Sequence, residues 1–170
     1  KLSLSYYADW QLDLETGQWS TDDGFLPQQN WKLLHVDSEE TAAENGRATR
    51  AFDGLANTFW HTQYTDTAPA PPHELQIDLG ARRQLNALRY LPRQDGNDHG
   101  VITEYELYVS DDPAQWSTPV SAGKLAASFE PKLVPFAARS GRYVRFVARS
   151  EIHGQAWSSM AELDLAGLVQ

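Results

Sequence analysis

Cysteine is absent from this chain of 170 residues, so disulfide bonds cannot stabilise it. The fold must therefore rest on a hydrophobic core, with or without a bound ion, and the absence does not exclude export from the cell. No run approaches the roughly 18 consecutive apolar residues that a membrane-spanning helix needs. No signal peptide is visible at Lys1, and we expect the chain to be part of a longer protein.

Basic residues are also scarce. The chain has 14 Lys and Arg against 23 Asp and Glu, which gives a formal net charge of -9. A surface this acidic repels the phosphates of nucleic acids and anionic lipid heads. We therefore expect neither nucleic acid nor an acidic membrane to be a partner.

Sustained helical periodicity is missing, whereas short alternating apolar runs are frequent. Residues 75–79, 105–109, 143–148 and 161–165 have the pattern of strands with one face buried. Six Trp, seven Tyr and six Phe suit a β-rich fold. Because Gly, Pro and Asp clusters separate these runs, the sequence predicts an all-β sandwich.

The first 29 residues have a less regular pattern. Residues 2–6 alternate, and residues 11–14 suggest a further strand. This segment is too short to bury a core of its own. We therefore expect residues 1–29 to form an N-terminal extension packed on a single domain of residues 30–170. Residues 65–72 are rich in Ala and Pro, and they predict an ordered loop rather than a central strand.

Catalytic motifs are lacking. Glu39-Glu40 is interpreted as a solvated turn rather than a glycosidase pair, because adjacent side chains diverge on a strand. Ser158-Ser159 has no partner set resembling a Ser-His-Asp triad. The five histidines are not at paired metal-ligand spacing, and no glycine-rich motif could cradle a phosphate. The residues therefore favour a binding module over an enzyme.

Hard oxygen donors suggest a calcium site. Asp53-Gly54 begins a turn, Thr58 follows five positions later, and Glu162 could close the ligand shell. The alternative is that Asp53 and Thr58 only cap a turn. The residue types alone do not favour either interpretation.

A second set of side chains suits a surface that grips hydroxyl groups. The guanidinium of Arg93 can bridge two hydroxyls, His61 can donate or accept, and Glu44 can accept. Tyr64 and Trp157 offer faces on which the C–H side of a sugar ring can stack.

The alternative for this set is purely structural. Trp60 is predicted to be core, and His61 beside it could be a satisfied structural histidine. Arg93 could simply pair with Asp95 or Asp98. Taken one at a time, the residues favour this structural interpretation.

The order of several short motifs shows a resemblance to a known family. The motifs are Val36-Asp37-Ser38, Ala51-Phe52-Asp53-Gly54, Asn57-Thr58-Phe59-Trp60-His61-Thr62, Pro72-His73, Ile77-Asp78-Leu79-Gly80, Leu91-Pro92-Arg93-Gln94-Asp95-Gly96, Tyr105-Glu106-Leu107-Tyr108-Val109-Ser110, Arg142-Tyr143-Val144-Arg145 and Ala161-Glu162-Leu163. Residues 30–165 resemble the discoidin, or coagulation factor type C, fold. Within that fold they are most similar to family 32 carbohydrate-binding modules, which include galactose-binding modules of bacterial sialidases and the first domain of fungal galactose oxidase.

The resemblance implies a jelly-roll β-sandwich with a structural calcium ion. Transferred residue by residue, the ligands are the carbonyls of Arg50, Leu55 and Ala161 and the side chains of Asp53, Thr58 and Glu162. Position 55 is usually polar in the family, but a carbonyl ligand is compatible with leucine.

The resemblance also implies a sugar site on loops at one end of the sandwich. The implied residues are Glu44, His61, Tyr64, Arg93, Asp98, His99 and Trp157. The family often has Asn directly before the glycine at position 100, where this chain has His99 with Asp98 beside it. The match of Glu44, His61 and Arg93 to family binding positions shifts the balance from the structural to the functional interpretation.

The expected function is a non-catalytic module that recognises galactose, N-acetylgalactosamine or terminal galactosides. It would direct an attached enzyme to glycans, as part of a larger, secreted or cell-surface bacterial protein. One alternative is an adhesion or lipid-binding domain of the same fold, which the acidic charge disfavours. Another is a structural spacer in a carbohydrate-active enzyme.

Overall fold

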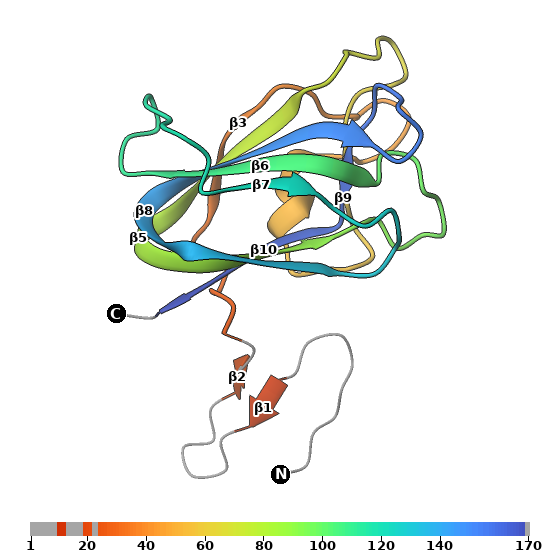
Figure 1. The fold of residues 1–170 in the computed structure, drawn as a ribbon. Helices are drawn as coiled ribbons and strands as arrows, with labels where there is room; N and C mark the ends of the chain where they lie inside the picture. Colours follow the sequence, from red (N-terminus) through yellow and green to blue (C-terminus); the bar gives the residue numbers. More distant parts are fainter. Residues whose placement is uncertain (1–9, 13–18, 22–23, 169–170) are drawn as a thin grey trace.

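The computed structural model describes residues 10–12, 19–21 and 24–168, and almost all of its regular structure is β-strand (Figure 1). One short 3-10 helix, η1, spans Ala48–Phe52. The strands are β1 (Trp10–Leu12), β2 (Trp19–Thr21), β3 (Lys32–Val36), β4 (Trp60–His61), β5 (His73–Leu91), β6 (Ile102–Ser110), β7 (Ser121–Lys124), β8 (Lys132–Glu151), β9 (Ser159–Met160) and β10 (Glu162–Leu168). The predicted all-β class and the four predicted strands are confirmed.

Two long antiparallel strands, β5 and β8, connect the two layers of the sandwich. The main sheet has the order β10-β5-β8-β6-β7, and β3 pairs with β5 outside this path. The first half of β5 lies beside β3, and its second half lies beside β10. Figure 1 shows both long strands curving over at one end of the molecule. Each strand therefore contributes one half to each layer.

The bend of β5 follows Asp78, where the register with β8 shifts. Gly80 adopts a φ of 79°, a left-handed conformation that favours glycine. Arg142 of β8 donates two hydrogen bonds of 2.8 Å to the carboxylate of Asp78. This forked pair fixes the two strands together at the bend.

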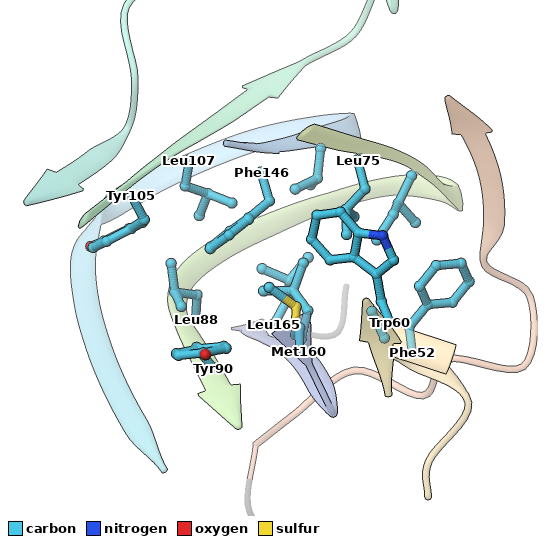
Figure 2. Close-up of a cluster of buried hydrophobic side chains, with 14 of the residues drawn as sticks. Phe52, Trp60, Leu75, Leu88, Tyr90, Tyr105, Leu107, Phe146, Met160 and Leu165 are labelled. Carbon is cyan, nitrogen blue, oxygen red and sulfur yellow. The ribbon is translucent and has the colours of Figure 1, made fainter. Parts of the chain in front are cut away.

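The core lies between the two layers (Figure 2). Tyr105, Leu107 and Val109 of β6 are buried at alternate positions, as the period of two requires. The rings of Tyr105 and Phe146 stack with centroids 5.9 Å apart. Trp60 is fully buried, as predicted, and its Nε1 donates to the carbonyl of Ser38 at 2.9 Å.

Part of the predicted N-terminal extension adds to the edge strand β10. β1 and β2 pair with each other, and β1 overlaps the strand expected at residues 11–14. Phe25 forms a β-bridge to Ala166, and the amide of Leu26 donates to the carbonyl of Leu165 at 2.8 Å. The strand suggested for residues 2–6 lies outside the described residues. The domain boundary at residue 29 stays a prediction.

No helix in the described parts of the chain is long and apolar enough to span a membrane. Residues 65–72 contain no strand and form the loop that their composition predicts.

Candidate functional site

The connections after β3, β4, β5 and β8 come together at the end of the sandwich on the right in Figure 1. They enclose a pocket of about 290 Å³. Its lining residues are Glu44, His61, Tyr64, Arg93, Asn97, His99 and Trp157. An acid, an imidazole and a guanidinium from three separate segments therefore meet in one hollow.

His61 ends strand β4 and is almost completely buried. Its Nδ1 lies 2.6 Å from the carbonyl oxygen of Thr62, and because a carbonyl only accepts, Nδ1 carries the proton. Burial is the largest influence on the pKa of His61 and lowers it below 6.5, despite the opposing effects of the Thr62 carbonyl and Glu44. At neutral pH the ring is therefore uncharged, and Nε2 is a hydrogen-bond acceptor.

Arg93 follows strand β5, and only 5% of its surface is exposed. Asp95 accepts from its Nε at 2.8 Å and from its Nη2 at 2.5 Å, and the guanidinium lies 4.2 Å from the centre of the Phe59 ring. Its Nη1 has no hydrogen-bond partner among the described residues. The predicted pairing with Asp95 is present and orients the guanidinium, and it leaves donors that a ligand could use. The functional interpretation of Arg93 stays a prediction.

Glu44 and Tyr64 form the wall beside His61. The rings of His61 and Tyr64 meet edge to face with centroids 5.0 Å apart. Partial burial, and after it the negative charges of Glu44 and Glu40, raise the pKa of the Tyr64 phenol. This wall therefore offers the carboxylate of Glu44 as an acceptor, next to a Tyr64 ring whose hydroxyl keeps its proton at neutral pH.

His99 and Trp157 form a second wall of the pocket. Their rings lie 5.0 Å apart at an angle of 37°. The indole Nε1 of Trp157 is buried and has no hydrogen-bond partner within the described structure. The wall combines a broad apolar face with an imidazole edge, which suits the C–H side of a sugar ring.

Asp98 is the predicted sugar-site residue that does not line the pocket. Its carboxylate lies 3.0 Å from Nε2 of His153, and this hydrogen bond lowers the pKa of Asp98. Asn97, which the sequence analysis did not single out, lines the pocket instead. Its Oδ1 accepts from the amide of His99 at 2.9 Å, so the turn itself directs Asn97 and His99.

Glu40 contradicts the prediction of a solvated turn, because it is fully buried. Its two carboxylate oxygens accept hydrogen bonds from the backbone on either side of the pocket wall that carries Glu44 and Tyr64. The hydrogen bond from the amide of Tyr64 is the largest of several causes that hold its pKa well below the usual range. The sequence shows only an acidic residue in the loop after β3, and glutamate is usually exposed. The burial of Glu40 could therefore not be inferred from its residue type.

The residues predicted to bind calcium gather at the turn after η1. Asp53 accepts from the Thr58 hydroxyl at 2.9 Å and 2.8 Å, and the same hydroxyl lies 3.1 Å from the carbonyl oxygen of Leu55. The amide of Leu55 donates to Glu162 at 2.9 Å. Burial, then the charges of Asp164 and Asp53, raise the pKa of Glu162 to about 8.

The other two expected ligands adjoin this turn. Arg50 lies in η1, which leads directly into it, and Ala161 precedes Glu162. No cluster of three or more His, Asp or Glu side chains in the described residues has the geometry of a metal site. A cation here would therefore depend on the mixture of two carboxylates, a hydroxyl and backbone carbonyls.

Solved structures with this fold include two that are relevant to the pocket. A family 32 carbohydrate-binding module of Clostridium perfringens in complex with GalNAc-β-1,3-galactose is 34% identical, with a TM-score of 0.77, and the match covers 84% of this chain and 99% of that one. The family 32 module of C. perfringens NanJ in complex with galactose is 28% identical, with a TM-score of 0.70, and the match covers 84% and 97%.

Two longer proteins are also similar to this chain. A sialidase of Micromonospora viridifaciens is 40% identical over 145 residues, which are 85% of this chain and 22% of the sialidase. A galactose oxidase of Gibberella zeae is 40% identical over 141 residues, which are 82% of this chain and 20% of the oxidase. The chain thus spans about a fifth of these relatives. The sequence model of the F5/8 type C domain matches residues 35–163, and the chain belongs to this family.

Proposed function

We propose that this domain is a non-catalytic carbohydrate-binding module for galactose-type sugars. The observation that carries the proposal is the pocket in which Glu44, His61 and Arg93 meet beside the rings of Tyr64, His99 and Trp157. The bound sugars named for the two similar C. perfringens modules, galactose and GalNAc-β-1,3-galactose, support the same class of ligand.

The protonation states of the pocket suggest how a hexose is held. Arg93 donates from the part of its fork that Asp95 does not occupy, and Glu44 accepts, so the two can grip adjacent ring hydroxyls, including the axial one. His61 accepts a further hydroxyl at Nε2. Tyr64 or Trp157 packs against the apolar face of the ring.

Selectivity follows from the burial of these groups. A sugar whose hydroxyl points away leaves a buried donor or acceptor unpaired, which costs about 1–3 kcal/mol. Because a single hexose offers few apolar contacts, the affinity of one site is expected to be weak. Attachment to an enzyme would then raise the local concentration of that enzyme on a glycan.

We also propose a structural calcium ion at the turn formed by Asp53, Leu55 and Thr58. All the expected donors are hard oxygens, which calcium prefers. Asp53 and Glu162 are already linked through the amide of Leu55, so a cation would tie this turn to β10. This set of donors supports a calcium ion that stabilises the fold and does not contact the sugar.

Removal of calcium tests this second proposal. At a calcium concentration 100 times the dissociation constant, binding to the folded state adds about 2.7 kcal/mol of stability. For a domain of this size that corresponds to a rise in Tm of roughly 5–10 °C. Asp53→Asn should abolish the rise, and Asp66→Asn, on the exposed loop after β4, should keep it. An equal Tm with calcium and with chelator would contradict the site.

For the whole protein, we propose a secreted or cell-surface bacterial enzyme with several domains. The support is that the similar sialidase and galactose oxidase are each about five times longer than the matched region. This domain would supply attachment to glycans, and another domain would supply the activity.

Isothermal titration with a panel of monosaccharides tests the sugar proposal. We expect heat with galactose and N-acetylgalactosamine, and much less with glucose, whose 4-hydroxyl is equatorial rather than axial. Absence of heat with every galactoside would refute the proposal. Pelleting with anionic liposomes, in a separate sedimentation assay, would instead favour the lipid-binding alternative.

A further inference from the structure

Two buried carboxylates, those of Glu40 and Glu151, lie behind the pocket walls. Glu40 has no exposed surface, and 3% of Glu151 is exposed. Neither side chain lines the pocket, and neither forms an ion pair with Lys or Arg in the parts of the chain that the structure describes. Because isolated buried carboxylates are costly, each must be satisfied in another way.

Glu40 is satisfied by donors from two loops. Its Oε1 accepts from the amides of Ala42 at 2.7 Å and Ala43 at 3.0 Å, directly before Glu44. Its Oε2 accepts from the amide of Tyr64 at 3.0 Å, and from the amide and hydroxyl of Thr65. One side chain thus ties together the two segments that carry Glu44 and Tyr64.

Glu151, the last residue of β8, does the same on the other side. Its Oε1 accepts from the amides of His153 at 2.7 Å and Gln155 at 2.6 Å, in the loop that leads to Trp157. Its Oε2 accepts from the amide of Gly100 at 3.2 Å, next to His99. The loop after β8 and the loop after β5 are therefore joined behind the wall that His99 and Trp157 form.

We propose that Glu40 and Glu151 are positioning residues for the sugar pocket, each holding one of its two walls. The inference rests on the proposed function. A loop that is ordered before binding does not lose conformational freedom when the sugar arrives, so the clamps raise affinity without touching the ligand. The two acids would set the distance between the walls rather than any one contact with the sugar.

Glu40→Gln and Glu151→Gln test the proposal. Glutamine keeps the size, but its amide group turns a donor toward backbone amides, so some of them lose their acceptor. We expect each change to weaken galactose binding about tenfold in protein that is still folded at 25 °C. Glu39→Gln is the matched control, because Glu39 also accepts from a backbone amide, that of Ala48 at 2.9 Å, but Ala48 lies in η1, which carries no residue of the pocket.

Double mutants separate positioning from general destabilisation. If Glu40 acts through the wall of Tyr64, the effect of Glu40→Gln on affinity should shrink in a Tyr64→Ala background and persist in a Trp157→Ala background. Glu151→Gln should show the opposite pattern. Equal effects in both backgrounds, or equal losses in Glu39→Gln, would overturn the assignment of walls to acids.

Amide hydrogen exchange gives a readout that does not need the sugar. In Glu40→Gln the amides of Ala42, Ala43 and Tyr64 should lose protection, while that of Gly100 keeps it. If Glu40→Gln does not fold, Thr65→Val takes its place in this test. It removes one donor to Glu40 and should lower the protection of the same amides by a smaller amount.

The outcomes separate this proposal from the sugar function itself. Wild-type protein that binds no galactoside refutes the function, and the positioning role falls with it. Wild-type binding with unchanged affinity in folded Glu40→Gln and Glu151→Gln overturns the positioning role alone.

Discussion

Two hollows in the described part of the chain have similar residue types but different construction. The larger, about 590 Å³, lies where β5 and β8 bend and the loop after β6 begins. It contains Arg82, Asp111 and Trp116, and the smaller pocket contains Arg93, Glu44 and Trp157. The Arg82 and Asp111 side chains are 60% and 54% exposed, whereas only 6% of the Arg93 side chain is exposed.

From this difference we infer that fixed polar groups, rather than volume, favour the smaller pocket as the sugar site. In the larger groove the arginine and its acid are solvated, so water screens them and their geometry is loosely held. In the smaller pocket a buried fork, a neutral imidazole and clamped loops present fixed polar groups. The comparison predicts that sugar binding depends on the residues of the smaller pocket and not on their counterparts in the groove.

We expect the largest difference in galactose affinity between the variants Arg93→Ala and Arg82→Ala. Hydrogen bonds to a charged group contribute about 1.5–3 kcal/mol each, and 1.4 kcal/mol is a factor of ten. Arg93→Ala should therefore weaken galactose binding about 100-fold in a titration, and Arg82→Ala should leave it unchanged. Comparable losses in both variants would end the distinction between the two hollows.

Glu44→Gln against Asp111→Asn should show a smaller difference of the same sign. The change removes one charge-assisted acceptor and leaves the shape, so we expect a loss of about tenfold. Asp111→Asn affects only the solvated pair with Arg82 and should not alter the dissociation constant. Full affinity in Glu44→Gln would show that the carboxylate does not accept from the sugar.

Trp157→Ala against Trp116→Ala compares the two aromatic side chains. Loss of one stacking face is expected to weaken binding about threefold to tenfold. Trp157→Phe, which keeps a ring, should retain most of the affinity, and Trp116→Ala should retain all of it. A loss confined to Trp116→Ala would move the sugar site to the groove.

The smallest expected effect is that of pH between 8 and 6.5. Burial lowers the pKa of His61, so Nε2 stays an acceptor across this range and the affinity should be constant. The same shift favours the folded state above pH 6.5, and this contribution is lost as the pH falls toward the lowered pKa. Titrations at a series of pH values should show weakening only in more acidic solution. Weakening that begins at or above pH 6.5 would contradict the assignment.

His35→Gln is the control for this pH profile. His35 is an exposed histidine of β3 that lies 3.7 Å from Glu74, away from the pocket. Its replacement should leave the profile unchanged.

Much of the fold was predictable because strand alternation depends on local residue order. Leu75, Ile77 and Leu79 of β5 are buried as their spacing requires. The bend at Asp78, which divides β5 between two layers, was not predictable, because it depends on the pairing with Arg142, 64 residues away.

The sequence by itself determined the alternating strands, the buried Trp60 and the types of most pocket residues. Tertiary structure alone decided that Asp95 rather than Asp98 pairs with Arg93, and that Asn97 faces the pocket. It also decided that Glu40 is buried against four backbone amides. The physical reason is that these outcomes depend on where backbone donors from distant loops converge, and backbone donors have the same chemistry in every residue except proline.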